Sequence, residues 1–277
     1  MPAHHIAAIG SSFAAGPSIP PIIDSKARRS GNNYPHLLAK NLGAEITDLT
    51  SSGATLLNIL REPQCVSILL PKWFDSLIPP QLDGLPEAAD IVTLTAGGND
   101  LGYSKGMLLD AMRIGLTQKK GIGWLIQKTG YGGDEASVGS TTLEEVRDRL
   151  VEVFDRVHEI APQAKIYLVD YVNVFGPDTK IEADQPLPQK TVETYIEVAK
   201  GLAGAYQEAA DLRPDLVRRV AISEMSQGHE LGSAEPWVTG FTFTMLRQGI
   251  TPYHPNAKGH VAIAEVLHEL IEKTRSA

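Results

Sequence analysis

Short apolar runs alternate with amphipathic segments along the whole chain. The apolar runs are rich in β-branched residues and flanked by polar ones, which predicts buried strands. They cover residues 5–9, 44–49, 89–95, 165–171 and 217–222. Apolar positions at helical spacing predict helices over residues 34–43, 107–116, 142–161, 189–212 and 256–274. Strands that alternate with helices indicate βαβ units and a mostly parallel sheet.

The expected fold is therefore three-layer α/β, with a mostly parallel five-stranded sheet between helices. No linker-like segment interrupts the pattern, so residues 1–277 are predicted to form one domain. Two irregular segments, residues 101–141 and 173–188, are expected to be insertions that cover a pocket. Their aromatic residues and the end of the preceding strand suggest a partly apolar pocket; these are Trp124, Tyr131, Tyr171 and Phe175.

Charge and cysteine content narrow the possible partners. With 25 Lys and Arg against 33 Asp and Glu, the net charge is −8, and there is no basic stripe with interleaved aromatics. This balance argues against nucleic acids and anionic membrane surfaces. No apolar run reaches the ~18 residues of a membrane span. Cys65 is the only cysteine, so no intrachain disulfide can form, and the first residues lack a secretory leader pattern. We therefore expect a cytoplasmic protein, with an oligomeric state that the pattern does not define.

Metals and nucleotide cofactors are not expected. No His-Glu-x-x-His pattern is present, and His4 and His5 have no carboxylate or cysteine partner at ligand spacing. The glycines at 97–98 and 130–133 lack the lysine of a phosphate loop and the spacing of a dinucleotide fingerprint. The sequence thus predicts neither a metal site nor a cofactor.

Turns of small residues follow three predicted strands and carry the candidate chemistry. They are Gly10-Ser11-Ser12, Ser52-Gly53-Ala54 and Gly97-Gly98-Asn99-Asp100. The carboxyl ends of parallel strands share one edge, so these turns are expected to converge on one crevice. His254, in the loop before the last helix, can act as the base for a serine nucleophile. The backbone N–H groups of Ser12 and Gly53 and the side-chain amide of Asn99 can stabilise an oxyanion.

In order and spread, these blocks resemble the SGNH (GDSL-like) hydrolases. That family has a serine block near the N-terminus, a lone glycine, a Gly-x-Asn-Asp block and a C-terminal histidine block. They match residues 10–14, Gly53, residues 97–100 and His254-Pro255, which together span nearly the whole chain. The resemblance implies a flavodoxin-like fold and hydrolysis of esters or related acyl groups. It assigns Ser12 as the nucleophile, His254 as the base, and Ser12, Gly53 and Asn99 as the oxyanion hole.

Two positions depart from the family pattern. Ser11 stands where the family usually has an aspartate, which leaves Ser11 as a rival hydroxyl to Ser12. Thr251 stands three residues before His254, where the triad aspartate usually lies. Some family members, including secreted bacterial esterases and lipases, have a similar Gly-His-x…Trp…His-Pro tail and orient the histidine with a main-chain carbonyl. The tail here is Gly228-His229-Glu230…Trp237…His254-Pro255. We therefore expect a Ser12–His254 dyad in which the carbonyl of Thr251 orients His254.

The sequence thus predicts a serine esterase or related acyl hydrolase that acts on a small-molecule ester. Two alternatives stay open. One is an acyltransferase that uses the same residues with an alcohol other than water. The other is a catalytically silent module that binds an acylated ligand. Fold and mechanism do not choose between a lipid, a sugar acetate and a metabolite ester. Asp100, directly after Asn99, is expected to fix the turn or cap a helix.

Overall fold

A five-stranded parallel sheet forms the centre of the structure, a computed structural model that describes residues 5–66, 76–117, 136–177, 179–180 and 185–275. Its strands are β1 (His5–Gly10), β4 (Glu45–Asp48), β7 (Ile91–Thr95), β8 (Lys165–Val169) and β9 (Val217–Val220). They are hydrogen-bonded in the order β4-β1-β7-β8-β9, and every pair is parallel. This is the flavodoxin-like order 2-1-3-4-5, so the predicted α/β fold is confirmed.

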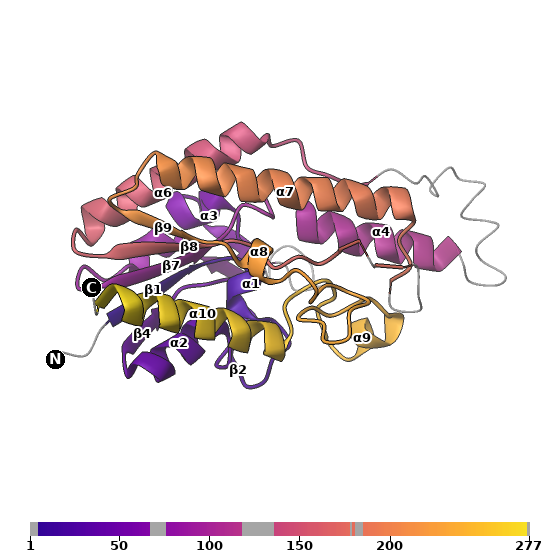
Figure 1. The fold of residues 1–277 in the computed structure, drawn as a ribbon, viewed down its shortest axis with the longest axis horizontal. Coiled ribbons are helices and arrows are strands. Elements are labelled where there is room, and N and C mark those ends of the chain that lie inside the picture. Colours follow the sequence, from indigo (N-terminus) through magenta and orange to yellow (C-terminus); the bar gives the residue numbers. More distant parts are fainter. Residues whose placement is uncertain (1–4, 67–75, 118–135, 178, 181–184, 276–277) are drawn as a thin grey trace.

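Helices cover both faces of the sheet (Figure 1). α2 (Tyr34–Leu42) and α10 (Ala257–Arg275) pack together on one face. The other face carries α3 (Leu56–Leu60), α6 (Leu143–Ile160) and α7 (Gln189–Asp211). α4 (Tyr103–Thr117) lies beyond the carboxyl edge of the sheet and contacts α7. The three layers are those that the strand and helix pattern predicts.

Capping residues fix where the longer helices begin and end. Asn33 accepts the His36 N–H at the start of α2, and Gly43 ends this helix in a left-handed conformation at φ 61°. At the start of α6, Thr142 and Glu145 each accept the other's backbone N–H, which forms a capping box. The predicted ends of α2 and α6 agree with the observed ones within one residue, whereas α4 begins at Tyr103, four residues before its predicted start at residue 107.

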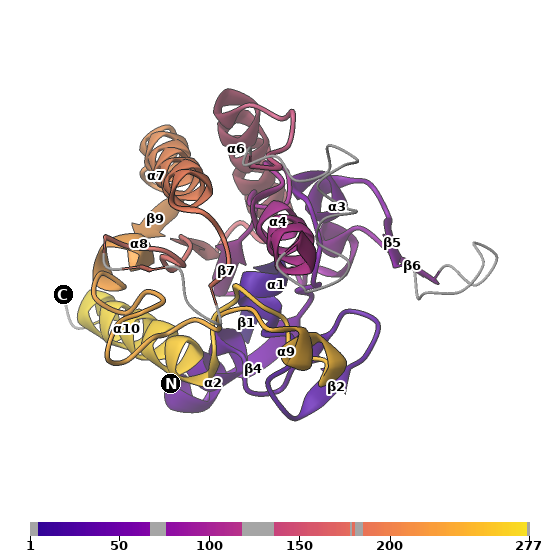
Figure 2. The same ribbon diagram turned by 90° about the vertical axis from the view of Figure 1, so that its right-hand side faces the viewer.

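Short elements fill the connections between the strands, and the sequence pattern does not predict most of them. They are α1 (Ser12–Ala15), β2 (Ile22–Asp24), β3 (Arg29–Ser30), β5 (Gln64–Val66), β6 (Ser76–Ile78), η2 (Gln81–Gly84), α8 (Ile222–Met225) and α9 (Phe243–Arg247). β2 and β3 form one antiparallel hairpin, and β5 and β6 form another. Figure 2 looks onto the carboxyl edge of the sheet, around which α1, β2 and α9 gather.

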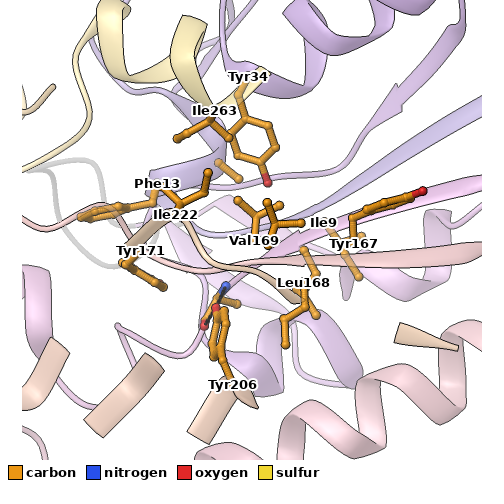
Figure 3. Close-up of a cluster of buried hydrophobic side chains, with 14 of the residues drawn as sticks. Ile9, Phe13, Tyr34, Tyr167, Leu168, Val169, Tyr171, Tyr206, Ile222 and Ile263 are labelled. Carbon is orange, nitrogen blue, oxygen red and sulfur yellow. Dashed lines mark hydrogen bonds between the residues drawn. The ribbon is translucent and has the colours of Figure 1, made fainter. Parts of the chain in front are cut away.

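Aromatic side chains pack where β1 and β7 end (Figure 3). The rings of Phe13 and Tyr171 have centroids 4.4 Å apart. The Tyr206 hydroxyl accepts the Ala96 N–H at 2.9 Å and donates to the carbonyl oxygen of the same residue. Because burial raises the pKa of Tyr206 well above its ordinary value, this hydroxyl stays protonated and keeps its donor. The backbone that leads from β7 to Asn99 is therefore held in place.

Candidate active site

Ser12 lies directly after β1, at the point where the chain order of the sheet reverses, which is where open α/β sheets bind ligands. The strand ends at Gly10, whose φ is 148°. A Cβ on Gly10 would lie 2.5 Å from the carbonyl oxygen of Thr95, so no larger residue fits. The side chain of Gln81 forms hydrogen bonds with both backbone groups of Gly10: it accepts the N–H at 2.7 Å and donates to the carbonyl oxygen at 2.9 Å. The sheet and Gln81 thus fix the position from which α1 presents Ser12.

The two neighbouring serines have different partners. Ser12 Oγ lies 2.7 Å from His254 Nε2, a contact between residues 242 positions apart in the chain. Ser11 Oγ lies 3.1 Å from the Tyr171 hydroxyl, which also accepts the Gly98 N–H at 3.1 Å. Ser11 is therefore engaged in a buried contact with Tyr171. Of the two hydroxyls, that of Ser12 has the adjacent base that a serine nucleophile requires.

A main-chain carbonyl orients His254, but it is not the predicted one. His254 Nδ1 lies 2.6 Å from the carbonyl oxygen of Pro252. Because a carbonyl only accepts, Nδ1 carries the hydrogen and Nε2 presents its lone pair to the serine. The predicted carbonyl, that of Thr251, instead accepts the Thr239 hydroxyl at 3.1 Å. The difference arises at Tyr253, a buried residue whose left-handed φ of 55° turns the Pro252 carbonyl back toward the imidazole ring.

The surroundings of His254 keep its imidazole neutral. Burial, and to a smaller extent the nearby positive charge of Arg28, lower the pKa of His254 to about 4, although the Pro252 carbonyl acts in the opposite direction. No carboxylate of the described residues forms an ion pair with His254, so nothing stabilises the imidazolium by charge. The ring is thus a free base at neutral pH and can accept a proton from Ser12.

The three predicted oxyanion donors come from turns that are joined by hydrogen bonds. The Ser51 N–H donates to the Gly10 carbonyl at 3.0 Å, and Asn99 Nδ2 donates to the Ala54 carbonyl at 2.9 Å. Gly53 has a φ of 88°. Among the described residues, no hydrogen-bond acceptor lies opposite the N–H groups of Ser12 and Gly53. Asn99 Nδ2 has a second hydrogen beyond the one directed at Ala54, so all three groups retain a donor.

Asp100 has the structural role that its position predicts. One carboxylate oxygen accepts the N–H of Leu56, the first residue of α3, at 3.0 Å, and the other accepts from Arg149 at 2.9 Å.

Within the described ranges, no group of three or more His, Cys, Asp or Glu residues is placed to hold a metal ion. In the same part of the chain, no helix has the length and apolar character needed to cross a membrane.

The tail before α10 packs against the start of that helix. The rings of His229 and Trp237 stack with centroids 4.1 Å apart, and the Asn256 N–H donates to the Trp237 carbonyl at 2.8 Å. Asn256 Oδ1 accepts the Gly259 N–H at 3.0 Å and so caps α10. Asn256, two residues after His254, therefore anchors the histidine loop to the helix.

The predicted pocket is only partly described. A cavity of about 740 Å³ lies between α7 and the loops that follow β8 and α8, and residues of both irregular segments line it, among them Tyr103 and Phe175. Neither Ser12 nor His254 lines this cavity. Tyr171 is buried against Ser11 and does not line it, and Trp124 and Tyr131 lie outside the described residues.

Two supporting residues carry little signal in the sequence. Gln81 lies in a proline-rich stretch without periodicity, and only the fold brings it to Gly10. Pro252 differs from the predicted Thr251 by a single position, and the choice between them depends on the backbone of Tyr253. Tyr171 does carry a signal, because it is the last residue of a predicted strand and so is expected at the same edge of the sheet as Ser12.

Comparison with known proteins shows the family and the fold of the chain. The chain is 26% identical over 262 residues to Lipase 2 of Streptomyces coelicolor, covering 93% of this chain and 82% of that protein. Its fold is similar to phospholipase A1 from Streptomyces albidoflavus NA297, with a TM-score of 0.70 at 22% identity over 97% and 99% of the two chains. It is also similar to an extracellular lipase from Streptomyces rimosus, with a TM-score of 0.66 at 19% identity over 96% and 99% of the chains. The model of the GDSL-like lipase/acylhydrolase family matches residues 8–262, and the chain belongs to this family of ester hydrolases.

Proposed function

We propose that the chain hydrolyses carboxylic esters through an acyl-enzyme on Ser12, with His254 as the general base. The observation that carries this proposal is the 2.7 Å contact between Ser12 Oγ and the Nε2 of a buried, neutral imidazole. His254 takes the hydroxyl proton as Ser12 Oγ attacks the ester carbonyl. The N–H groups of Ser12 and Gly53 and the amide of Asn99 stabilise the resulting oxyanion.

The same groups complete the acylation of Ser12 and then carry out the hydrolysis of the acyl-enzyme. His254 gives its proton to the leaving alcohol, and the acyl group stays on Ser12. A water molecule then gives up a proton to His254 and attacks the acyl carbon. As the bond between the acyl carbon and Ser12 Oγ breaks, His254 returns the proton to Oγ, which releases the acid and restores the serine. The Pro252 carbonyl keeps the imidazole in one tautomer throughout, since it accepts the Nδ1 hydrogen in both protonation states.

A p-nitrophenyl ester series of rising acyl length tests the proposal, with Ser12→Ala and Ser11→Ala compared with the wild type. We expect Ser12→Ala to lose turnover by at least about 10⁴-fold, as in other enzymes that lose a triad member. Ser11→Ala is the matched control, because it removes a hydroxyl one residue away that faces Tyr171. Equal losses in both variants would contradict the assignment of Ser12.

A fluorophosphonate probe separates an active enzyme from a silent binding module, because only an activated serine reacts quickly. We expect the probe to label the wild type at Ser12 and not to label Ser12→Ala. Since Lipase 2 and the phospholipase A1 are named for lipid esters, the series extends to long acyl chains. Addition of a competing alcohol measures transfer against hydrolysis, and transfer as the main product would favour the acyltransferase alternative.

A further inference from the structure

Arg28 lies between the two loops that flank the proposed active site. It occupies the turn between β2 and β3, where the carbonyl of the preceding residue, Ala27, accepts the Ser52 N–H at 2.9 Å, directly beside Gly53. Its Nη2 donates to Thr251 Oγ1 at 2.7 Å, three residues before His254. The guanidinium is therefore held at the mouth of the site, between the oxyanion turn and the histidine loop.

The positive charge of Arg28 has no acidic partner within the described residues. The neighbouring Arg29 forms ion pairs with the carboxylates of Asp24 and Asp48, each at 3.6 Å. The contact that Arg28 makes is with the neutral hydroxyl of Thr251. Partial burial lowers the pKa of Arg28 from its ordinary value, but the residue as a whole is exposed, so its charge can be reached by a ligand from solvent.

The backbone around Arg28 is held in an uncommon conformation. Arg28 has a φ of 52°, and the other non-glycine residues with positive φ in the described ranges are Ser18 and Tyr253, at 75° and 55°. Ser18 joins the same cluster, since its hydroxyl lies 2.9 Å from Thr251 Oγ1 and accepts the Thr251 N–H at 2.8 Å. Such conformations persist where the surrounding contacts enforce them, and they concentrate at sites that bind ligands.

We propose that Arg28 binds an anionic group of the ester substrate, a carboxylate or a phosphate, and so selects acidic esters over neutral ones. The inference rests on the proposed ester hydrolysis and adds a substrate class to it. A guanidinium has five N–H donors in one plane, and the single bond to Thr251 orients that plane while leaving four donors for an oxyanion. Because the chain as a whole carries a net charge of −8, an acidic substrate needs a local cation of this kind near the serine.

The test uses two pairs of esters in which one member carries a carboxylate and the other is neutral and of similar size. Mono-p-nitrophenyl adipate and p-nitrophenyl hexanoate differ on the acyl side, and 4-acetoxybenzoate and 4-acetoxybenzamide, each with one ester bond, differ on the alcohol side. The readout is the ratio of kcat/KM for the anionic ester to that for its neutral partner. We expect the wild type to prefer the anionic ester in one pair, and that pair shows which half of the substrate carries the charge.

Arg28→Gln is expected to lower this ratio about 10-fold, mainly through KM, and Arg28→Lys to lower it less, because the charge remains without the planar fork. Lys26→Gln is the matched control, since it removes one exposed positive charge from the same turn and should leave the ratio unchanged. In 0.5 M salt the wild-type preference should shrink while that of Arg28→Gln stays constant.

Two results would overturn the proposal: a wild type without preference in either pair, or an Arg28→Gln variant that loses activity equally on both members of each pair. The second result would mean that Arg28 acts only by holding Thr251 and the histidine loop. The neutral hexanoate reports on ester hydrolysis independently. If Ser12-dependent turnover of the hexanoate is seen without charge preference, the proposed function stands and the role of Arg28 fails.

Discussion

A neutral carbonyl in place of a carboxylate changes the base strength of the histidine. A carboxylate would fix the tautomer of His254 and also stabilise the imidazolium, whereas the Pro252 carbonyl fixes the tautomer with only a partial charge. Burial then dominates and lowers the pKa of His254 to about 4. Such an imidazole is a weaker base, but the fraction that is free to accept a proton stays near one well below neutral pH.

The pH dependence of kcat/KM for a neutral ester follows from this. The active form of His254 is the neutral one, and its pKa is lowered, so activity should persist as pH falls and be lost only near pH 4. Measurement of kcat/KM from pH 4 to 8 checks the position of the acid limb. An acid limb near pH 6.5, the ordinary value for histidine, would contradict the buried, neutral base.

Substitution at Thr251 provides the matched comparison for this pH profile. Thr251→Asp places a carboxylate beside Arg28 and three residues before His254, which favours the imidazolium and partly neutralises the guanidinium. Both effects raise the pKa of His254, so the acid limb should move to higher pH. Thr251→Asn, of the same size and without charge, should leave the limb near its wild-type position.

The longer helices and strands could be predicted from the sequence, whereas the strands of two or three residues could not. The predicted helix over residues 142–161 and the predicted strand over residues 89–95 are confirmed as α6 and β7. The helix has apolar positions at helical spacing and a capping box, and the strand is a buried run rich in β-branched residues. The β2–β3 hairpin was missed, since strands of two or three residues have no alternation to detect and depend on tertiary pairing. Arg28, on that hairpin, was missed with it. The assignments of Ser12, Gly53, Asn99 and His254 as site residues stay predictions, now with a geometry that supports them.

The close approach of β1 to β7 makes Gly10 the most sensitive point of the central sheet. A Cβ at this position would meet the Thr95 carbonyl oxygen at 2.5 Å, and the φ of 148° is itself unfavourable for other residues. Gly10→Ala should therefore destabilise the fold by about 2 kcal/mol or more. Since Gly10 sets the position of Ser12, ester turnover should fall as well.

Gly204→Ala is the matched control for Gly10→Ala. Gly204 lies exposed within α7, where an added Cβ would meet no atom within 4 Å and the backbone is ordinary helix. Alanine there should raise the free energy of unfolding by about 0.5 to 1 kcal/mol through its higher helix propensity. Urea unfolding of both variants checks the opposite signs, and a stabilising effect of Gly10→Ala would contradict the close approach of the two strands.

At the scale of the whole molecule, two buried histidines on either side of the start of α10 link stability to pH. His260 is fully buried, and its Nδ1 accepts the Tyr34 N–H at 3.0 Å. Burial, with a smaller contribution from His254, lowers the pKa of His260 to about 3. Its Nε2 has no partner among the described residues, so protonation would place an uncompensated charge in the interior.

Both histidines have a lower pKa in the folded state than the ~6.5 of an unfolded chain. Below pH 6.5 the unfolded chain therefore binds more protons than the folded one, and stability falls as pH decreases. Well above pH 6.5 both histidines are neutral in the folded and the unfolded chain, so neither makes the free energy of unfolding depend on pH. Each contributes about 1.4 kcal/mol per pH unit well below pH 6.5 and half of that at pH 6.5, so the pair should lower the free energy of unfolding by about 3 kcal/mol between pH 6.5 and pH 5.

His260→Asn isolates one half of this effect, because the asparagine oxygen can replace Nδ1 as acceptor for the Tyr34 N–H and does not titrate. Urea unfolding at pH 7, 6 and 5 should show that the free energy of unfolding declines less for the variant than for the wild type. The difference in this free energy between the two proteins should change by about 2 kcal/mol from pH 7 to pH 5. The difference between the two proteins cancels the contributions of the carboxyl groups, among them Asp100 and Asp170, whose pKa values are raised by burial. Parallel declines would show that His260 does not carry the linkage, and the acid sensitivity would then have to come from His254 and the carboxyl groups alone.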